Sequence, residues 1–550
     1  MHEVTGASDR DTAPPTRRSS VIARLRGIAP LPVWGLAVLA GALVVLTTLD
    51  GAGISWDSAA YVQSGINLAH SNGLVELGGR RMTAFPPGLP VIAAVFEIVG
   101  ISPRAGLRFI GIAGAALIVL LGWRLLRQIP APPAFRLVAI TFVAVSPILL
   151  TVESMLWSET MFIVLTLTFL VAAGRIIERR TYDWRAIVAL SLLCWAAFAV
   201  RYVGLVLIPT GIVVFLTARW KPTRRELANV VAFAALASVG PMAWMLRNRS
   251  IDGSTTGARN ASVTSIGSIV DSFMSTVGRW ADSVTSLARP ETTILGVVVT
   301  IAFLGVMAVA VTTAVRRHDT AFGRSVIPVA FFCAVYLAQL FTAQATTLLD
   351  PIDTRLLSPV FVPLVVTITA GLAMIMPTRS TAGDPESRSR TTAIITGLIC
   401  FALVSTFAGT LRDIHGGDIR TSDFNTARWR DSELAAATRT AVAGTDTRVM
   451  TNGVLGLWVA TGQDRIIEMP LALTWRGEIA TGEVARFLRH VDCSDGPVLA
   501  AMYAEGSATA IPIEDLGSIA RFTVIGIYAD GTLYRVEPLP TSADRVVCPP

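Results

Sequence analysis

The sequence predicts an all-α polytopic membrane protein with a small C-terminal α/β domain outside the membrane. Charged residues make up only 15% of the 550 residues, and the mean hydropathy is +0.59. Apolar residues stand in blocks of about 20, the length that a helix needs to cross the hydrocarbon core. Residues 411–550, by contrast, carry 13 Arg against 18 Asp and Glu, a net charge of −5 that leaves +12 on residues 1–410.

The apolar blocks predict about eleven membrane spans. Two neighbouring blocks are short and have Arg201 and Tyr202 between them. The first block is long for the core of a signal peptide and has no clear cleavage site, so we interpret it as an uncleaved anchor. The predicted spans are 31–49, 105–126, 136–152, 158–177, 186–200, 203–218, 228–246, 293–314, 325–344, 356–376 and 392–411.

The distribution of arginine predicts the orientation. Arginine clusters before the first span and in alternate short loops, and basic loops stay on the cytoplasmic side. We therefore expect a multi-pass plasma-membrane protein with a disordered, basic cytoplasmic tail at 1–30, a transmembrane domain at 31–411 and an extracytoplasmic α/β domain at 412–550. The polar loop 378–391 is also predicted to be disordered.

Two segments on the outer side are predicted to fold. In the first outer loop, 50–104, one helix follows Trp56. A second helix, too short to span, follows Pro86-Pro87 and is expected to lie along the membrane interface or dip into it. The acidic tail alternates helical and extended patterns, with a hairpin at Asp530-Gly531. These patterns predict a small α/β domain.

The five cysteines fall into two groups. Cys194, Cys333 and Cys400 lie inside predicted spans, where a thiol is usually a small apolar filler. Cys493 and Cys548 lie in the outer tail, in an oxidising space, so a disulfide between them is one interpretation. Two unpaired thiols are the other, and the sequence does not separate the two.

Two carboxylates on the outer side are the first candidates for chemistry, because an ionisable group at or within the membrane is costly. Asp57 follows the first span and precedes a predicted helix, and Glu159 stands at the mouth of the fourth span. Each has a structural alternative, since Asp57 or Ser58 can cap a helix and Glu159 can stabilise a first helical turn. Together the two carboxylates can act as a base and its helper, or bind a cation.

Arginines on the outer side form the next candidate group, because the positive-inside rule disfavours them there and a compensating anion is expected. A guanidinium fork matches phosphate oxygens, and outer-leaflet phosphates belong to lipids. Any single arginine can instead snorkel to headgroups or pair with an acidic neighbour. The group consists of Arg80, Arg81, Arg201, Arg247, Arg249 and Arg355.

No motif of a soluble enzyme competes with these candidates. The sequence has no Walker loop, no H-E-x-x-H and no C-x-x-C pair. The outer histidines His70, His415 and His490 are scattered and indicate no metal site.

Six segments, in chain order, resemble motifs of the GT-C glycosyltransferases. The nearest branch contains bacterial relatives of the protein O-mannosyltransferases and the lipid-A aminoarabinose transferase. The resemblance covers about residues 31–376, and the tail resembles the small outer domain of many members. The segments are Asp57 with the helix after it, Phe85-Pro86-Pro87-Gly88-Leu89-Pro90, Trp157-Ser158-Glu159-Thr160-Met161-Phe162, Arg201-Tyr202-Val203-Gly204, Trp244-Met245-Leu246-Arg247-Asn248 and Asp353-Thr354-Arg355-Leu356-Leu357-Ser358-Pro359.

The resemblance implies an inverting transferase that uses a polyprenyl-phosphate sugar at the outer membrane face. Asp57 matches the family's catalytic aspartate, which deprotonates the acceptor hydroxyl, and Glu159 matches its second acidic residue. We choose Arg247 and Arg355, with Arg201 in support, for the leaving-group phosphate. Further substrate contacts are expected from Tyr61, Arg80, Arg81, Tyr202, Asn248 and Asp353.

The chain also departs from the family. Some relatives have a lysine directly before the Pro-Pro pair, where this chain has Phe85, and Arg80 or Arg81 is the candidate replacement. Some relatives bind a divalent metal near the site, and the sequence shows no clear ligand set, so metal dependence stays open. Family acceptors include proteins, lipids and cell-wall glycans. Membrane lipids are expected partners, and nucleic acid is not.

Two other functions stay open at this point. A transporter or flippase of a lipid-linked or anionic substrate also suits eleven spans, but it usually shows internal repeats and helices broken at the midplane. This sequence has no repeated half, and its charged candidates gather at one face. The third possibility is a non-catalytic scaffold whose outer domain binds a partner.

Overall fold

The computed structural model describes most of the chain. The predicted disordered segments lie outside the described residues, apart from Ala29 and Pro30, and so does most of the predicted span 392–411. The described residues are 29–77, 79–129, 131–179, 183–218, 222–282, 289–316, 321–375, 404, 406–412, 414–415, 423–463, 465–473, 479–480, 482–494 and 496–539.

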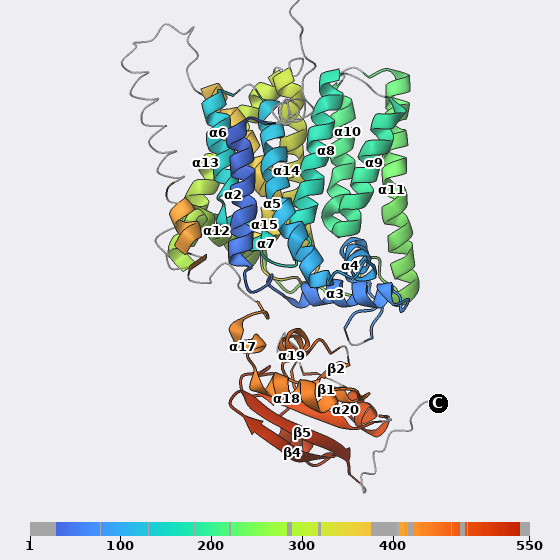
Figure 1. Cartoon of the computed structure of the whole chain (residues 1–550). Helices are drawn as coiled ribbons and strands as arrows, with labels where there is room; N and C mark the ends of the chain where they lie inside the picture. The colour runs from blue at the N-terminus through green and yellow to red at the C-terminus, as the bar shows by residue number, and fades with distance from the viewer. Residues whose placement is uncertain are drawn as a thin grey trace, which may run out of the picture.

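The long helices stand side by side in one upright bundle (Figure 1). Within the described residues, six helices are long and apolar enough to cross a membrane, and the bent pair α6–α7 makes a seventh. The apolar helices α2, α9 and α10 are shorter. A polytopic helical bundle is therefore confirmed, and the count of eleven spans stays a prediction. The bundle helices are α2 (Leu31–Thr47), α5 (Pro103–Arg127), α6 (Pro133–Ala144), α7 (Pro147–Glu153), α8 (Glu159–Arg179), α9 (Trp184–Val200), α10 (Leu207–Ala218), α11 (Arg224–Asp252), α13 (Arg289–Arg316), α14 (Ala321–Thr346) and α15 (Thr354–Ile375).

One predicted span is not a continuous helix. The segment 136–152 is divided into α6 and α7, which are bent by 43° relative to each other. Pro147 is the first residue of α7, and its ring disfavours helical conformation at the residue before it and removes a backbone donor. The pair still passes as one bent span, and the predicted range 136–152 did not indicate the bend because apolar length does not register such a break.

Short helices cover the end of the bundle that carries the C-terminal domain, which we call the domain end. They are α3 (Trp56–Ala69), α4 (Gly88–Ile98) and α12 (Ile266–Ala281). Ser55 and Ser58 form a capping box at the start of α3. A Cβ at Gly88 would meet Ala199 O at 2.5 Å, so α4 packs closely against the end of α9. Both helices predicted for the first outer loop are present.

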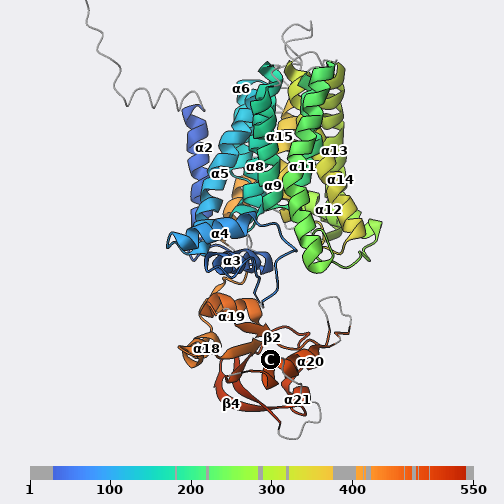
Figure 2. The same cartoon turned by 90° about the vertical axis from the view of Figure 1, so that its right-hand side faces the viewer.

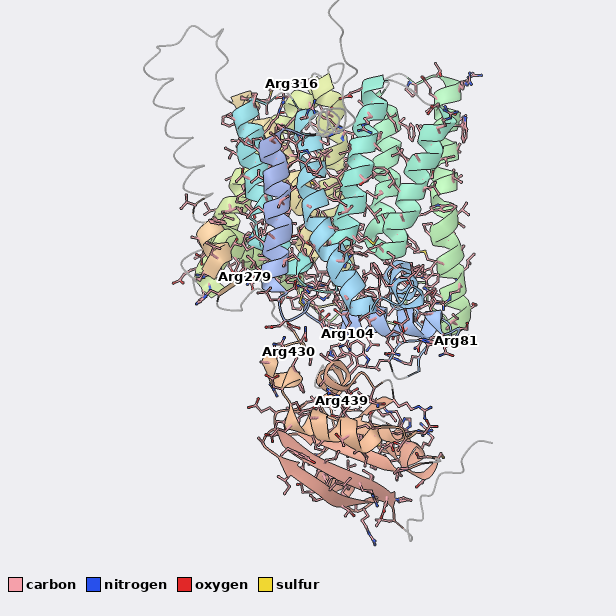
Figure 3. All side chains as sticks on the ribbon, viewed as in Figure 1. Arg81, Arg104, Arg279, Arg316, Arg430 and Arg439 are labelled. Atoms are coloured by element: carbon pink, nitrogen blue, oxygen red, sulfur yellow. The ribbon has the colours of Figure 1, made fainter. Side chains whose placement is uncertain are left out.

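Arginines gather at the opposite end of the bundle. α5 ends at Arg127, α13 ends at Arg316, and α11 begins at Arg224. Figure 3 shows Arg316 at this upper end and Arg104 at the domain end. The domain end carries arginines too, among them Arg81, Arg104 and Arg279, so by the arginine-rich end we mean only the end at which α5, α13 and α11 have these terminal arginines.

The C-terminal domain is built on a five-stranded mixed sheet with the order β2-β1-β3-β5-β4. β1 pairs in parallel with β2 and β3, and β3 pairs antiparallel with β5. β4 and β5 form the hairpin predicted at Asp530-Gly531. The elements are α17 (Ala427–Arg430), α18 (Glu433–Val442), β1 (Arg448–Thr451), α19 (Val454–Thr461), β2 (Ile466–Glu468), α20 (Glu483–Asp492), β3 (Val498–Tyr503), α21 (Ile513–Leu516), β4 (Ala520–Tyr528) and β5 (Gly531–Pro538).

Cys493, the residue after α20, is disulfide-bonded. The predicted partner Cys548 lies outside the described residues, so the pairing itself stays a prediction.

The domain docks against the bundle through α19, which lies beneath α3 in Figure 2. Trp458 Nε1 donates to Gln63 Oε1 of α3 at 3.1 Å. The guanidinium of Arg104, in the first turn of α5, lies 4.3 Å from the ring centroid of Trp458 and donates to Val459 O at 3.1 Å. The sequence predicted that the domain lies on this side but did not indicate these contacts.

Candidate active site

Arg355 joins the two candidate carboxylates at the domain end. Its Nε donates to Glu159 Oε1 at 2.6 Å, and its Nη2 donates to Asp57 Oδ2. Arg201 donates from Nη1 to the same oxygen of Glu159. We call Asp57, Glu159, Arg201 and Arg355 the ion cluster.

The ion cluster is nearly closed to solvent. The side chain of Glu159 is fully buried, and those of Arg201 and Arg355 are 15% and 16% exposed. Two carboxylates and two guanidinium groups balance in charge, so each buried ion has an opposite partner, as burial requires. Asp57 is the most open member, at 22% exposed, and a substrate therefore has its readiest access to the cluster there.

Every member of the ion cluster lies at a helix end. Asp57 is in the first turn of α3 and Glu159 is the first residue of α8, positions where the helix dipole favours an anion. Arg355 is the second residue of α15, where the same dipole disfavours a cation, and the two carboxylates compensate for that. Arg201 is extended between α9 and the 3-10 helix η1 (Tyr202–Val206).

Trp157, which was not among the predicted site residues, packs its ring against the guanidinium of Arg355. The Cζ of Arg355 lies 4.6 Å from the Trp157 ring centroid, a cation–π contact. Trp157 Nε1 donates to Ser55 Oγ at 2.7 Å, which ties the ring to the N-cap of α3. Its position two residues before Glu159 is the signal that could have identified it.

The hydroxyl groups of Ser158 and Tyr61 contact the ion cluster on its buried side. Ser158 Oγ accepts from Arg201 Nη1 at 2.8 Å and from Tyr61 Oη at 3.4 Å. Tyr61 is buried, and burial, with the charges of Asp57 and Glu159 adding to it, raises the pKa of its phenol. Tyr61 therefore stays protonated and acts here as a hydrogen-bond donor.

Three of the residues expected to contact substrate hold the first outer loop in this structure. Tyr202 Oη donates to Thr83 O at 2.6 Å and accepts from Asn248 Nδ2 at 2.8 Å and Trp244 Nε1 at 3.1 Å. Arg247 Nη1 donates to Met82 O at 2.5 Å. We call Tyr202, Trp244, Arg247 and Asn248 the loop clamp, because their contacts fasten residues 82 and 83 to α11.

Arg247, predicted to bind the donor phosphate, makes no hydrogen bond or ion pair with the ion cluster among the described residues. Its guanidinium lies over Trp244, 4.4 Å from the ring centroid, and Nη1 also donates to Asn248 Oδ1 at 3.0 Å. The structure therefore separates Arg247 and Arg355, which the sequence analysis had placed in one role.

The two arginines considered as replacements for the missing lysine lie in the first outer loop outside the ion cluster. Arg80 pairs with Glu76 at 3.6 Å and its side chain is 83% exposed, and Arg81 is exposed as well. Burial raises the pKa of the Glu76 carboxyl, which Arg80 opposes and nearby Asp57 reinforces. Glu76 is a carboxylate near the site that the sequence analysis missed.

Asp353 has a structural contact that positions Arg355. Its Oδ1 accepts from the backbone N–H of Leu356 at 2.9 Å, so it caps α15. Tyr336 Oη donates to Leu356 O at 2.8 Å and holds the same turn from α14. The start of α15, and Arg355 with it, is therefore fixed from two sides.

No family model and no curated protein matches this sequence. Solved structures do match it. ArnT from Cupriavidus metallidurans in the apo state has a TM-score of 0.54 at 12% sequence identity, over 94% of this chain and 98% of that chain. The same protein bound to undecaprenyl phosphate has a TM-score of 0.50 at 13% identity over the same shares. The arabinofuranosyltransferase AftD from Mycobacteria has 0.51 at 16% identity, over 92% of this chain and 40% of that chain. The chain has the GT-C fold.

The GT-C resemblance left a divalent metal open, and the described residues do not fit one. They contain no group of three His, Cys, Asp or Glu side chains that could hold an ion. Asp57 and Glu159 are both bound to the guanidinium of Arg355, a cation between two carboxylates. We therefore derive no step through a metal.

Proposed function

We propose that this GT-C protein transfers a sugar from a polyprenyl-phosphate donor to an acceptor hydroxyl at the outer face of the plasma membrane. The ion cluster carries this proposal, because it combines an accessible carboxylate with two guanidinium groups at one end of a membrane bundle. Guanidinium forks match the oxygens of a lipid phosphate. ArnT, which shares the fold, was solved with undecaprenyl phosphate bound.

The reaction is a direct displacement at the anomeric carbon. Asp57 accepts the proton of the acceptor hydroxyl while the acceptor oxygen bonds to that carbon. The bond from the carbon to the phosphate oxygen breaks, and its electron pair stays on the polyprenyl phosphate. Arg355 and Arg201 stabilise the negative charge that develops there. Because the acceptor enters opposite the leaving phosphate, the configuration inverts.

Donor binding exchanges ion pairs within the cluster. Arg355 is bound by Asp57 and Glu159, so a phosphate replaces one of them to reach its guanidinium. Asp57 is the more exposed carboxylate, and its displacement leaves its oxygen available to the acceptor hydroxyl. Glu159 is fully buried and keeps both arginines in place. In this proposal Asp57 is the base and Glu159 positions the arginines.

The arrangement of charge supports an outer location for this chemistry. The arginine-rich end of the bundle belongs in the cytoplasm by the positive-inside rule, which also places the N-terminus there. The ion cluster and the C-terminal domain then face the outside. The acceptor is a hydroxyl of a lipid, a glycan or a protein.

Transfer by the purified protein in lipid vesicles tests the proposal. The vesicles receive a panel of radiolabelled polyprenyl-phosphate sugars together with an envelope extract as acceptor. We expect a labelled product from at least one donor. Asp57→Asn lowers the initial rate by about 10²- to 10⁴-fold, the contribution of a general base, while the melting temperature in detergent stays near that of the wild type.

Asp50→Asn is the matched control, because it makes the same change in the same loop at a side chain that is 69% exposed. It should transfer sugar at the wild-type rate. A labelled donor that crosses the vesicle membrane without forming product would favour the transporter alternative. Undiminished transfer by Asp57→Asn would remove Asp57 from the role of base.

A further inference from the structure

The segment that leads into α3 lies between two other segments that bond to its backbone. On one side, Gly53 N donates to Ser154 O and Leu156 N donates to Gly53 O, both at 2.9 Å. On the other side, Phe424 N donates to Ile54 O at 2.8 Å. Residues 423–425 of the C-terminal domain therefore lie against the backbone segment that precedes Asp57 in the chain.

The side-chain carboxylate of Asp423 joins the two segments by hydrogen bonds to backbone N–H groups of both. Its Oδ1 accepts from Ile54 N at 2.8 Å and from Asn425 N at 2.7 Å. The side chain of Asn425 continues the contact, donating from Nδ2 to Ala52 O at 3.0 Å. A Cβ at Gly51, whose φ is +103°, would lie 2.7 Å from that nitrogen, so the two segments approach too closely for a larger residue.

Residues 53–55 and 154–156 lead along the chain to the two carboxylates of the ion cluster, Asp57 and Glu159. Ile54 is followed by Ser55, which caps α3, and Asp57 is in the first turn of that helix. Leu156 lies three residues before Glu159, the first residue of α8. The backbone bonds at 53 and 54 thus set the distance between two carboxylates that share Arg355.

We propose that Asp423 is a positioning residue for Asp57, through which the C-terminal domain holds the first outer loop in the geometry that transfer requires. This inference rests on the proposed function. Asp423 is 9% exposed and reaches the site through the backbone of Ile54. A misplacement of about 1 Å at a reacting group costs on the order of 100-fold in rate, so loss of this bond lowers turnover without removing a group that touches substrate.

A pair of substitutions at Asp423 separates positioning from charge. Asp423→Asn keeps an oxygen that can accept both N–H bonds, and Asp423→Ala removes the acceptor. The expected result is a kcat lowered about 10- to 100-fold by Asp423→Ala with the donor KM changed less than about threefold. Asp423→Asn is expected to retain kcat within about threefold of the wild type.

Trp458→Phe is the matched control for domain docking in general. It removes the bond from Trp458 Nε1 to Gln63 but keeps a ring against Arg104, and it leaves residues 423–425 unchanged. Wild-type kcat is expected for this variant. Amide hydrogen exchange of a peptide covering residues 50–57 gives a readout apart from activity, and exchange should be faster in Asp423→Ala than in wild type or Trp458→Phe.

Each result has one meaning. Wild-type kcat in Asp423→Ala, or equal losses in Asp423→Ala and Asp423→Asn, overturns the positioning role. Equal losses in Asp423→Ala and Trp458→Phe also overturn it, because the effect would then belong to docking as a whole. Absence of transfer by the wild-type protein with every donor overturns the proposed function instead, and the exchange measurement then still judges the contact between Asp423 and the loop.

Discussion

Arg355 binds both candidate carboxylates with one guanidinium group and stacks on Trp157 with its face. A lysine carries the same charge, but its ammonium is a compact point that neither forks between two carboxylates nor stacks as a plane. Arg355→Lys is therefore expected to lower kcat/KM for the donor by about 10²- to 10³-fold, the loss typical of one preorganised donor to a developing anion. Initial rates at varied donor concentration measure it.

Arg279→Lys supplies the comparison for this prediction. Arg279 is exposed at the same end of the bundle and donates to Thr276 Oγ1 at 2.9 Å on its own helix. Its replacement should leave kcat/KM within about twofold of the wild type, as expected for a surface position. Comparable losses in both variants would mean that positive charge near the membrane surface, and not the ion cluster, binds the donor.

All four residues of the ion cluster were candidates from the sequence. The sequence did not indicate that Tyr202, Arg247 and Asn248 belong to a different group of contacts, the loop clamp. Asp57 and Glu159 stood out because carboxylates at a membrane face are costly. Arg247 and Arg355 looked alike, since both are arginines on the same side in segments that resemble family motifs. Their different partners, Met82 O for one and Asp57 with Glu159 for the other, depend on which helices pack together.

At the scale of elements, we expect a substitution in the loop clamp to lower the stability of the protein but not its rate of sugar transfer. Tyr202→Phe removes a hydroxyl that bonds Thr83 O, Asn248 and Trp244. Asn248 still bonds Thr83 O and Thr255 O, but Trp244 Nε1 has no other partner among the described residues. An unpaired, half-buried donor costs about 1–3 kcal/mol, so the melting temperature in detergent should fall. Turnover at a temperature where the variant is folded should stay within about threefold of the wild type, because the ion cluster is unchanged.

Tyr534→Phe on β5 is the control, since no described residue forms a hydrogen bond with that hydroxyl. Its melting temperature should match that of the wild type. If Tyr202→Phe melts normally but loses turnover, then Tyr202 contacts substrate, as the family resemblance implied, and its clamp contacts are secondary.

Most elements followed from local patterns. Apolar length predicted the bundle helices, and the turn residues at Asp530-Gly531 predicted the hairpin of β4 and β5. The break between α6 and α7 was missed because the apolar run continues across Pro147, and composition does not measure backbone geometry. That bend matters for the site, since α7 ends at Glu153 and leads directly into the segment 154–156.

At the scale of the whole molecule, the orientation predicts opposite labelling of the two ends. A cysteine at the exposed Ser518 in the C-terminal domain should react with a membrane-impermeant thiol reagent in intact cells. A cysteine at the exposed Arg225, at the arginine-rich end, should react only after permeabilisation. Labelling of the unsubstituted protein measures the background, to which the buried thiols of Cys194 and Cys333 contribute little.

If Ser518→Cys is protected in intact cells and Arg225→Cys is labelled, the protein has the opposite orientation in the membrane. The ion cluster would then face the cytoplasm, and a donor presented at the outer face could not reach it.

Composition and charge alone determined that this chain is a polytopic membrane protein with an acidic C-terminal domain, because the hydrocarbon core admits only long apolar helices and because basic loops resist translocation. These are properties of each segment by itself. The partners of each arginine, the docking of α19 on α3 and the contact of Asp423 with the approach to Asp57 were decided only by the tertiary structure. Such contacts join residues up to several hundred positions apart, and no local pattern records which of them meet.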